Sequence, residues 1–219
     1  ITGITRTSTT VSIVGVGTTT LTATQAASAQ YSDASINTVL TVNSGTPTIS
    51  DFATLNTFNV GYSINPLILV KPTSNSDGAF TYSINVDASN IATVLGSVVT
   101  LKAVGTATIT ATQEASGNYT SGSTSAILTI SLGTPILLRN APYSSANITK
   151  NYGDGQFTLV ASSDSSGAIL YSSNTPSVAS INSSTGVVTV GVLGTATITV
   201  SQAATNKYNA PSNITWVVD

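Results

Sequence analysis

Few residues in this chain have side chains that could carry out chemistry. Only 6% of its 219 residues are charged, and the sequence contains no His and no Cys. A catalytic Ser is usually activated by a nearby His, and protein zinc sites use Cys or His ligands. We therefore interpret the many Ser residues as surface and turn residues. We expect neither nucleophilic catalysis, nor a zinc site, nor a bound cofactor.

Carboxylates are the remaining side chains that could act as general acids or bases. Glycoside hydrolysis, for example, uses two of them. The chain has eight acidic residues, but Glu114 is the only Glu. Several Asp residues stand in turn-like sequences such as Asp77-Gly78 and Gly153-Asp154-Gly155. No acid pair can be recognised, and we predict that the chain is not an enzyme.

Calcium is the one metal ion whose ligands the sequence offers, because it binds carboxylate, amide and carbonyl oxygens. Asp154 and Asp164 are the calcium candidates, and Asp77 and Asp87 are further acids in predicted loops. No Asp-x-Asp-x-Asp spacing is present. The alternative interpretation is that these acids are solvated turn residues.

An internal repeat of about 88 residues organises the chain. The segment Gly17-Thr-Thr-Thr-Leu-Thr-Ala-Thr-Gln25 recurs as Gly105-Thr-Ala-Thr-Ile-Thr-Ala-Thr-Gln113 and as Gly194-Thr-Ala-Thr-Ile-Thr-Val-Ser-Gln202. The tripeptide Gly45-Thr46-Pro47 recurs as Gly133-Thr134-Pro135. Such a period is too long for a solenoid repeat and suits a whole small β-domain.

The Gly-Thr-Pro tripeptides mark the predicted domain boundaries. We name the resulting ranges the first copy (1–46), the second copy (47–134) and the third copy (135–219). The second and third copies are predicted to be complete immunoglobulin-like domains. The first copy is predicted to be the C-terminal half of one.

Alternation of aliphatic and hydroxyl-bearing residues predicts β-strands and almost no helix. In the third copy, strands are predicted at 147–152, 157–162, 168–173, 178–181, 187–192, 195–201 and 214–218. The second copy gives a similar set, including 67–70, 80–84, 98–103 and 127–130. The predicted fold class is all-β, with tandem immunoglobulin-like β-sandwiches of about seven strands each. Within the best-matched strand, Ala107, Ile109 and Ala111 should face the core, and Trp216 should also be buried.

Three stretches of the sequence carry a resemblance to a known family. Tyr171–Ala204, its weaker partner Tyr82–Ala115, and Asn151–Ile169 resemble the bacterial immunoglobulin-like superfamily, especially its group 2 type. With the partial first copy, the resemblance covers nearly the whole chain. It implies a repeated, generally non-catalytic extracellular β-sandwich, as in adhesins, surface-layer and wall-associated proteins, and in phage and large-virus structural proteins. The second copy departs from the pattern at Ser63–Leu67, so no preserved role is expected for that loop.

The first copy begins about halfway through the repeat and should supply only the last three strands of a sandwich. Its predicted apolar face would then lie in water; that face comprises Val11, Ile13, Leu21, Ala23, Leu40 and Val42. One explanation is that the other half lies upstream in a longer chain. The other explanation is that a different chain supplies the missing strands by β-augmentation.

A Tyr follows each repeated Gln by six residues, and the chain carries several glycosylation sequons. Tyr31, Tyr119 and Tyr208 are expected to anchor the turn before the last strand through ring packing and a hydroxyl hydrogen bond. The alternative is that they are loop contacts for a ligand or carbohydrate. The sequons could carry glycans in a host that glycosylates secreted chains; they lie at Asn118, Asn147, Asn182 and Asn213.

Charge and hydropathy limit the partners and the location. The six basic residues are scattered, so no nucleic-acid binding is expected, and no apolar run is long enough to predict a membrane span in this segment. A surface solvated by hydroxyls and amides favours an extracellular, cell-surface or virion-surface location. We predict a non-catalytic structural or spacer module of a fibre, stalk or capsid decoration. Its partners would be copies of itself or other surface or virion structural proteins. The alternative is an adhesin-type module that recognises a glycan or surface protein through its loops.

Overall fold

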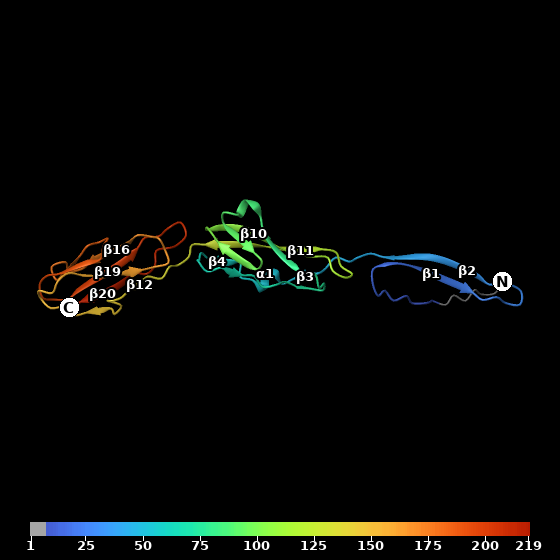
Figure 1. The fold of residues 1–219 in the computed structure, drawn as a ribbon, viewed down its shortest axis with the longest axis horizontal. Coiled ribbons are helices and arrows are strands. Elements are labelled where there is room, and N and C mark those ends of the chain that lie inside the picture. The colour runs from blue at the N-terminus through green and yellow to red at the C-terminus, as the bar shows by residue number, and fades with distance from the viewer. Residues whose placement is uncertain (1–7) are drawn as a thin grey trace. The chain divides into compact units, whose positions relative to one another are not determined.

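The computed structural model describes residues 8–219 and shows a chain of short β-strands (Figure 1). In these residues, helix is confined to a single turn, α1 (Phe52–Leu55), and one 3-10 turn, η1 (Val86–Ala88). The prediction of an all-β chain with almost no helix is therefore confirmed. None of the described helices has the length and apolar character needed to cross a membrane.

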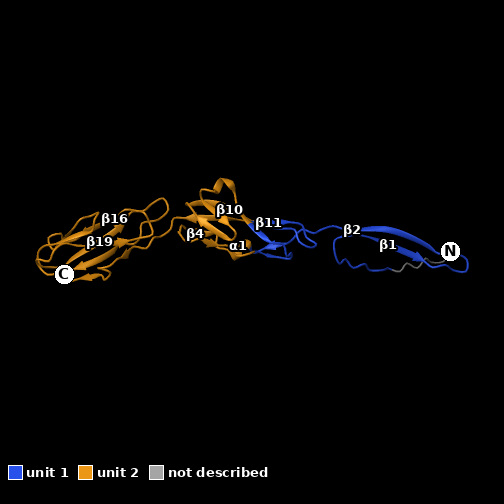
Figure 2. Ribbon diagram, viewed as in Figure 1, with its two compact units in different colours: residues 1–51, 72–81, 111–124 blue, residues 52–71, 82–110, 125–219 orange. Residues whose placement is uncertain are grey.

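The chain divides into two compact units whose limits differ from those of the repeat (Figure 2). One unit contains residues 1–51, 72–81 and 111–124, and the other contains residues 52–71, 82–110 and 125–219. The domain boundaries near Pro47 and Pro135 stay a prediction. The three copies are used below as names for sequence ranges.

The third copy folds with the strand order of an immunoglobulin domain. Its larger sheet has the order β13-β20-β19-β16, and a second sheet has the order β14-β18-β17, while β12 pairs with β15. These strands are β12 (Leu138–Arg139), β13 (Asn147–Ile148), β14 (Phe157–Thr158), β15 (Ala161–Ser162), β16 (Ile169–Ser173), β17 (Ala179–Ile181), β18 (Val187–Val190), β19 (Ala196–Gln202) and β20 (Ile214–Val218). If β12 with β13, and β14 with β15, are counted as two halves of one strand each, seven strands result. The larger sheet places the third, sixth and seventh strands side by side, as in the immunoglobulin fold.

The second copy repeats this order. Its larger sheet is β4-β11-β10-β7, its second sheet is β5-β9-β8, and β3 pairs with β6. These strands are β3 (Ile49–Ser50), β4 (Asn59–Gly61), β5 (Leu67–Ile68), β6 (Thr73–Ser74), β7 (Phe80–Ile84), β8 (Ala92–Leu95), β9 (Val98–Leu101), β10 (Gly105–Gln113) and β11 (Gly122–Ser131). The same topology in two successive copies confirms the predicted class of tandem immunoglobulin-like sandwiches.

Period-two alternation decides which side chains form the cores. In β10, Ala107, Ile109 and Ala111 are almost completely buried, as predicted. In the third copy, Ile198 of β19 lies opposite Trp216 of β20, and neither side chain is exposed. The cluster around them includes residues of both sheets, such as Phe157, Val188 and Ala179. The prediction that Trp216 belongs to the core is confirmed.

Several predicted strand boundaries in the third copy were wrong. The stretch predicted as one strand from Phe157 to Ser162 is interrupted after Thr158. Its first half pairs with β18 and its second half with β12. Residues 159 and 160 between the two halves form no strand. The strand predicted to run to Tyr152 ends at Ile148, and the two-residue strand β12 was not predicted.

The first copy contains two described strands rather than the three predicted. β1 (Gly17–Gln25) and β2 (Ala34–Val42) form an antiparallel hairpin in which Gly17 lies opposite Val42. Residues 10–13 form no strand. Their counterpart in the second copy, β9, is held on one side by β5, and residues 8–46 contain no counterpart of β5.

The Gln that ends the repeated strand is buried in the second and third copies. The Nε2 atom of Gln113 donates to the carbonyl oxygens of Ser76 (2.7 Å) and Gly78 (3.0 Å). Its Oε1 accepts from the hydroxyl of Ser74 at 2.6 Å. In the third copy, Gln202 likewise donates to Ser165 and Gly167. Each Gln thus holds the turn before the third strand against the sixth strand.

We expect Gln113→Leu to lower the free energy of unfolding by about 1–3 kcal/mol, because two buried carbonyl oxygens would lose their donor. Chemical denaturation followed by tyrosine fluorescence measures this change. Gln25→Leu is the matched control, since Gln25 ends the equivalent strand of the first copy but is exposed. Its effect should stay within about 0.5 kcal/mol. Equal effects of the two substitutions would contradict the role assigned to the buried Gln.

Asp51 links β3 to β6 through its carboxylate. It accepts hydrogen bonds from the hydroxyls of Thr73 (2.6 Å) and Ser50 (3.0 Å). These two bonds, that of Thr73 first, lower the pKa of Asp51 below its usual value of 3.8. Because the folded-state pKa is the lower one, the carboxylate stabilises the fold above pH 3.8, and this contribution is lost as the pH falls through the folded-state pKa.

The melting temperature of the wild type should therefore fall more steeply than that of Asp51→Asn as the pH drops below 3.8. Asn keeps the side-chain shape and tolerates the positive φ of 64° at this position but cannot titrate. The measurement is a series of thermal melts of both proteins in acid. Parallel profiles would show that Asp51 does not contribute.

Candidate functional site at the Gly-Thr-Pro junctions

The Gly-Thr-Pro segment between the second and third copies is bonded to the turn before the last strand of the third copy. The amide of Gly133 donates to the carbonyl oxygen of Lys207 at 2.9 Å, and the amide of Asn209 donates to that of Gly133 at 2.8 Å. Gly133 and Tyr208 thereby form a parallel β-bridge. Both backbone polar groups of Gly133 are satisfied by one turn, which fixes the course of the chain at this point.

Aromatic rings close around this glycine. A Cβ atom on Gly133 would lie 2.2 Å from the carbonyl oxygen of Tyr62 and 3.0 Å from Cδ1 of Tyr208. The two rings meet edge to face, with centroids 5.3 Å apart, and Tyr208 is buried. The Lys207 ammonium lies 4.9 Å from the centre of the Tyr62 ring and donates to its hydroxyl at 3.2 Å. Only glycine fits between these groups.

The Tyr208 hydroxyl does not make the hydrogen bond predicted for it. It is buried and has no hydrogen-bond partner among the described residues. Burial, and then the nearby carboxylate of Asp164, raise the pKa of Tyr208. The phenol therefore stays neutral, and Tyr208 acts at the junction through its ring.

The Gly-Thr-Pro segment between the first and second copies forms the same junction. The amide of Gly45 donates to the carbonyl oxygen of Asn118 at 2.9 Å, and the amide of Thr120 donates to that of Gly45 at 2.8 Å. Gly45 and Tyr119 form the parallel bridge. Here the Tyr119 hydroxyl accepts a hydrogen bond from Asn75 at 3.3 Å. Packing is looser, because a Cβ on Gly45 would lie 3.8 Å from the Tyr119 ring.

Tyr31 occupies the equivalent turn of the first copy but is exposed. The amide of Ser28 donates to the carbonyl oxygen of Tyr31 at 2.8 Å, and the reverse bond measures 3.3 Å. Ser116 and Tyr119 make the same pair of bonds in the second copy. The turn is thus built alike, yet Tyr31 is 73% exposed, and no Gly-Thr-Pro segment packs on it among the described residues.

The calcium candidates belong to no cluster of three or more acids among the described residues. The carboxylate of Asp154 accepts from the amide of Asn151 at 2.9 Å, and that of Asp164 from the amide of Ile136 at 3.3 Å. Residues 8–219 contain no group of three or more acids that could hold a metal ion. These geometries give the calcium hypothesis no support.

All four sequon asparagines are exposed. Asn182 orders its own turn, because its Oδ1 accepts from the amides of Ser184 (3.1 Å) and Thr185 (3.0 Å). Asn118 belongs to the junction just described, and its Oδ1 accepts from the amide of Val16 at 3.2 Å. Glycosylation of these residues stays a prediction.

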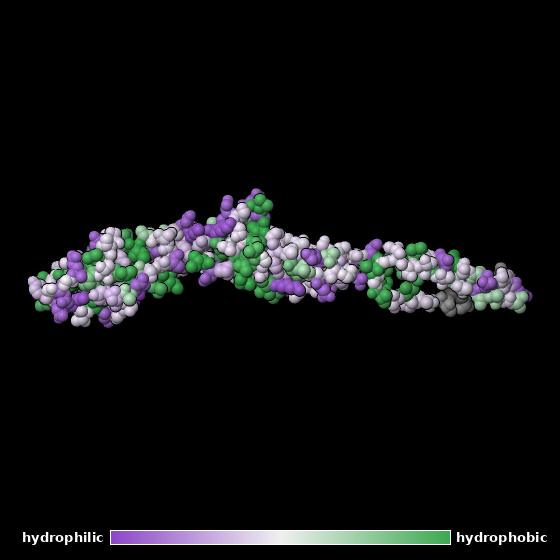
Figure 3. All heavy atoms as spheres, viewed as in Figure 1, coloured by the Kyte–Doolittle hydropathy of each residue, from purple (hydrophilic) through white to green (hydrophobic). Residues whose placement is uncertain are grey.

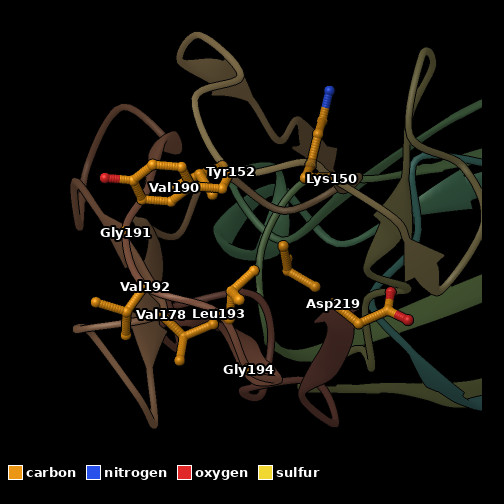
Figure 4. Close-up of a pocket in the computed structure, with 10 residues that line it drawn as sticks. Lys150, Tyr152, Val178, Val190, Gly191, Val192, Leu193, Gly194 and Asp219 are labelled. Carbon is orange, nitrogen blue, oxygen red and sulfur yellow. The ribbon is translucent and has the colours of Figure 1, made fainter.

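A small cleft in the third copy has no catalytic arrangement (Figure 4). Its volume of about 30 Å³ is that of a single water molecule, and its lining is largely apolar, with Val190, Val192 and Leu193. The Lys150 ammonium lies over the Phe157 ring at 4.8 Å and so is turned away from the cleft. In Figure 4, the Lys150 and Asp219 side chains point in different directions. The cleft offers no converging polar groups.

Comparisons with known proteins identify no family. No protein-family model matches the chain, and no curated protein matches it by sequence. The group 2 resemblance therefore stays a prediction.

Solved structures show only a distant likeness. Human protocadherin-24 EC1-2 is 10% identical, with 80% of this chain and 97% of that one covered and a TM-score of 0.30. Domains 1-6 of the surface layer protein SbsC are 12% identical, with 93% and 35% covered and a TM-score of 0.34. A SusE-like, surface-located polysaccharide-binding protein of Bacteroides thetaiotaomicron is 14% identical, with 82% and 35% covered and a TM-score of 0.31. At such scores the likeness supports no further conclusion.

Gly133→Ala should destabilise the third copy by about 1–3 kcal/mol, because the added methyl overlaps a backbone oxygen and the Tyr208 ring. Gly45→Ala is the matched control and should cost less than about 1 kcal/mol, since its Cβ has room. Thermal denaturation measures the stability, and hydrogen exchange at the Asn209 amide reports the junction directly. If both variants behave alike, the close packing at Gly133 does not hold the junction.

Proposed function

We propose that this chain is a non-catalytic spacer of an extracellular or virion surface assembly, in which successive copies of the repeat extend or tile the structure. The proposal rests on one observation: the same junction occurs twice in the chain. In both cases a glycine just before a copy is bonded through its amide and its carbonyl to that copy's own turn. A linker fixed in this way loses the freedom that a Gly-containing connection otherwise has.

The strand order suits a chain that bears tension. β13 runs parallel to β20, and β4 runs parallel to β11. Strands β4 and β13 come early in their copies, and β11 and β20 come last. A pull on the two ends of a copy therefore draws these parallel neighbours in opposite directions along their common axis. Their hydrogen bonds are then loaded together rather than one at a time.

Several backbone bonds connect each parallel pair. In the third copy, the amide of Val217 donates to Ala146 (2.7 Å), that of Asp219 to Ile148 (3.1 Å), and that of Lys150 to Asp219 (2.7 Å). In the second copy, the amide of Thr129 donates to Phe58 (2.6 Å) and that of Tyr62 to Ser131 (2.8 Å). The two complete copies therefore carry equivalent connections between their first and last strands.

The surface chemistry favours partners of the same kind. Thr residues of β10 alternate with its buried residues and are half buried or exposed. Their hydroxyl groups make this face of the sheet polar. With a formal net charge of −2 over the whole chain, long-range repulsion between copies is weak. Such surfaces suit packing against other copies of this chain or against other neutral surface proteins.

Force spectroscopy with the chain held at its two ends tests the spacer proposal. We expect two separate unfolding events, each adding about 300 Å of extended chain for a copy of 88 residues. Lys150→Pro removes the bond from the Lys150 amide to Asp219, just beyond the ends of β13 and β20, and should lower the force of one event, while the other event serves as the internal control. A single event, or no resistance to force, would contradict the proposal.

Binding arrays test the alternative. A spacer should show no saturable binding to glycans or host surface proteins. Saturable binding that Tyr152→Ser abolishes, at an exposed loop residue, would instead establish an adhesin-type module.

A further inference from the structure

A hollow of about 360 Å³ lies beside the Gly133 junction. Its lining includes Tyr62, Ile64, Asp164, Thr205 and Lys207, which all belong to one compact unit. The face of the chain drawn in Figure 3 mixes hydrophilic and hydrophobic residues, so polarity alone does not single out a site. This hollow is distinguished by two opposite charges, Lys207 and Asp164, which form no ion pair with each other or with any other described residue.

The Lys207 ammonium is held in place but has hydrogen-bond donors left. It lies 4.9 Å from the centre of the Tyr62 ring and donates to the Tyr62 hydroxyl at 3.2 Å. An ammonium group has three N–H donors, so two remain. Because the ring and the hydroxyl already fix the charge, little side-chain freedom is lost when a ligand binds to it.

Thr205 and Asp164 also have hydrogen-bonding capacity left. The Thr205 hydroxyl oxygen accepts from two amides of its own turn, at 3.2 and 3.0 Å, and its proton remains to be donated. The Oδ1 atom of Asp164 accepts from the amide of Ile136 (3.3 Å) and the hydroxyl of Ser163 (3.4 Å), while its Oδ2 accepts from no described residue. The hollow thus offers donors of Lys207 and Thr205 and a free acceptor of Asp164.

The first junction carries amides where this junction carries charges. Asn118 is the counterpart of Lys207, because the carbonyl oxygen of each accepts from the junction glycine. Asn75 is the counterpart of Asp164. Its Oδ1 accepts from a backbone amide at 2.8 Å, as the Oδ1 of Asp164 does at 3.3 Å. The junction therefore forms without either charge, and the Gly133 junction has both.

We propose that this hollow binds a small zwitterion of the α-amino acid kind. The ligand carboxylate accepts from the Lys207 ammonium and the Thr205 hydroxyl, and the ligand ammonium donates to the Asp164 carboxylate. A hydrocarbon side chain of the ligand lies against Ile64, which is 71% exposed. Such a site goes beyond the spacer role and does not depend on it.

Other classes of ligand leave a charge unmatched. A simple anion would be repelled by the Asp164 carboxylate, and a simple cation by the Lys207 ammonium. A divalent metal ion would find one carboxylate in this lining, and calcium sites use six to eight oxygen ligands. An apolar ligand would cover both charges without compensating them. A molecule that carries both charges matches the two groups.

The test titrates the isotope-labelled full chain with L-valine and follows its backbone amides by NMR. We expect saturable shift changes at the amides of residues 207–209, with a dissociation constant on the order of 1 mM. The amides of residues 118–120, in the equivalent turn of the first junction, are the internal control and should not shift.

Two fragments of the ligand separate its charges. 3-Methylbutanoate keeps the carboxylate and the hydrocarbon part of L-valine but lacks the ammonium, and isobutylamine keeps the ammonium but lacks the carboxylate. Each fragment should bind at least about tenfold more weakly than L-valine, because one charge-assisted hydrogen bond is lost and one protein charge stays unmatched.

A double variant gives the hollow the residues of the first junction. Asp164→Asn combined with Lys207→Asn should abolish binding, while hydrogen exchange at the Asn209 amide should stay slow because the junction keeps its backbone bonds. The matched control is Asp87→Asn combined with Lys102→Asn, which makes the same charge change at two exposed residues outside the hollow. It should leave the affinity within about twofold of the wild type.

Three results would overturn the proposal. The first is the absence of saturable shifts up to about 20 mM L-valine. The second is equal binding of either fragment, which would make the hollow a site for a simple ion. The third is binding that the Asp164→Asn, Lys207→Asn variant retains. The pulling and array measurements bear on none of these results, so the spacer proposal stands or fails separately.

Discussion

The burial of one face of the sixth and seventh strands is the constraint on which the structure depends. In β19, Ala196, Ile198 and Val200 are completely buried, while the Thr residues between them are half buried. Because side chains alternate with a period of two, the facing sheet must lie on that one side. The small Ala at the start lets the two sheets approach closely, and Ile198 with Trp216 fills the centre. Shifting the strand by one residue would bury hydroxyls and expose the aliphatic side chains.

The buried Gln side chains connect the core strands to the neighbouring turns. The same strand that provides the core ends in Gln202, or in Gln113 in the second copy, and each side chain satisfies two backbone carbonyl oxygens of a neighbouring turn. The glycines in those turns, Gly78 and Gly167, leave no room for a Cβ, which would lie 1.9 Å from the carbonyl oxygen of the residue that follows each Gln. One repeated sequence segment therefore specifies a strand, its core-facing side chains and the position of an adjacent turn.

Much of this architecture could be predicted from the sequence because its signals are local. The strands Phe80–Ile84 and Ile214–Val218 have the predicted limits, since both alternate clearly. The two-residue strand β12 has no alternation to detect, and the break between Thr158 and Ala161 leaves no mark in the alternation of the sequence. Both components of the junctions were visible as repeated residues, but their contact was not. Gly133 and Tyr208 are far apart in sequence, and neither residue alone indicates the other. The Tyr208 hydroxyl also differs from expectation, because it is buried without a hydrogen-bond partner among the described residues.

The junction has a consequence for how such a chain can evolve. It consists of one glycine and one turn, and its bonds are between backbone atoms, so it depends on few side chains of the copy. The glycine that precedes a copy is bonded by that copy's own turn. Duplication or deletion of a whole repeat by recombination therefore leaves a compatible connection at each new boundary. Chains of this design can lengthen or shorten in steps of one repeat while every remaining copy keeps its fold.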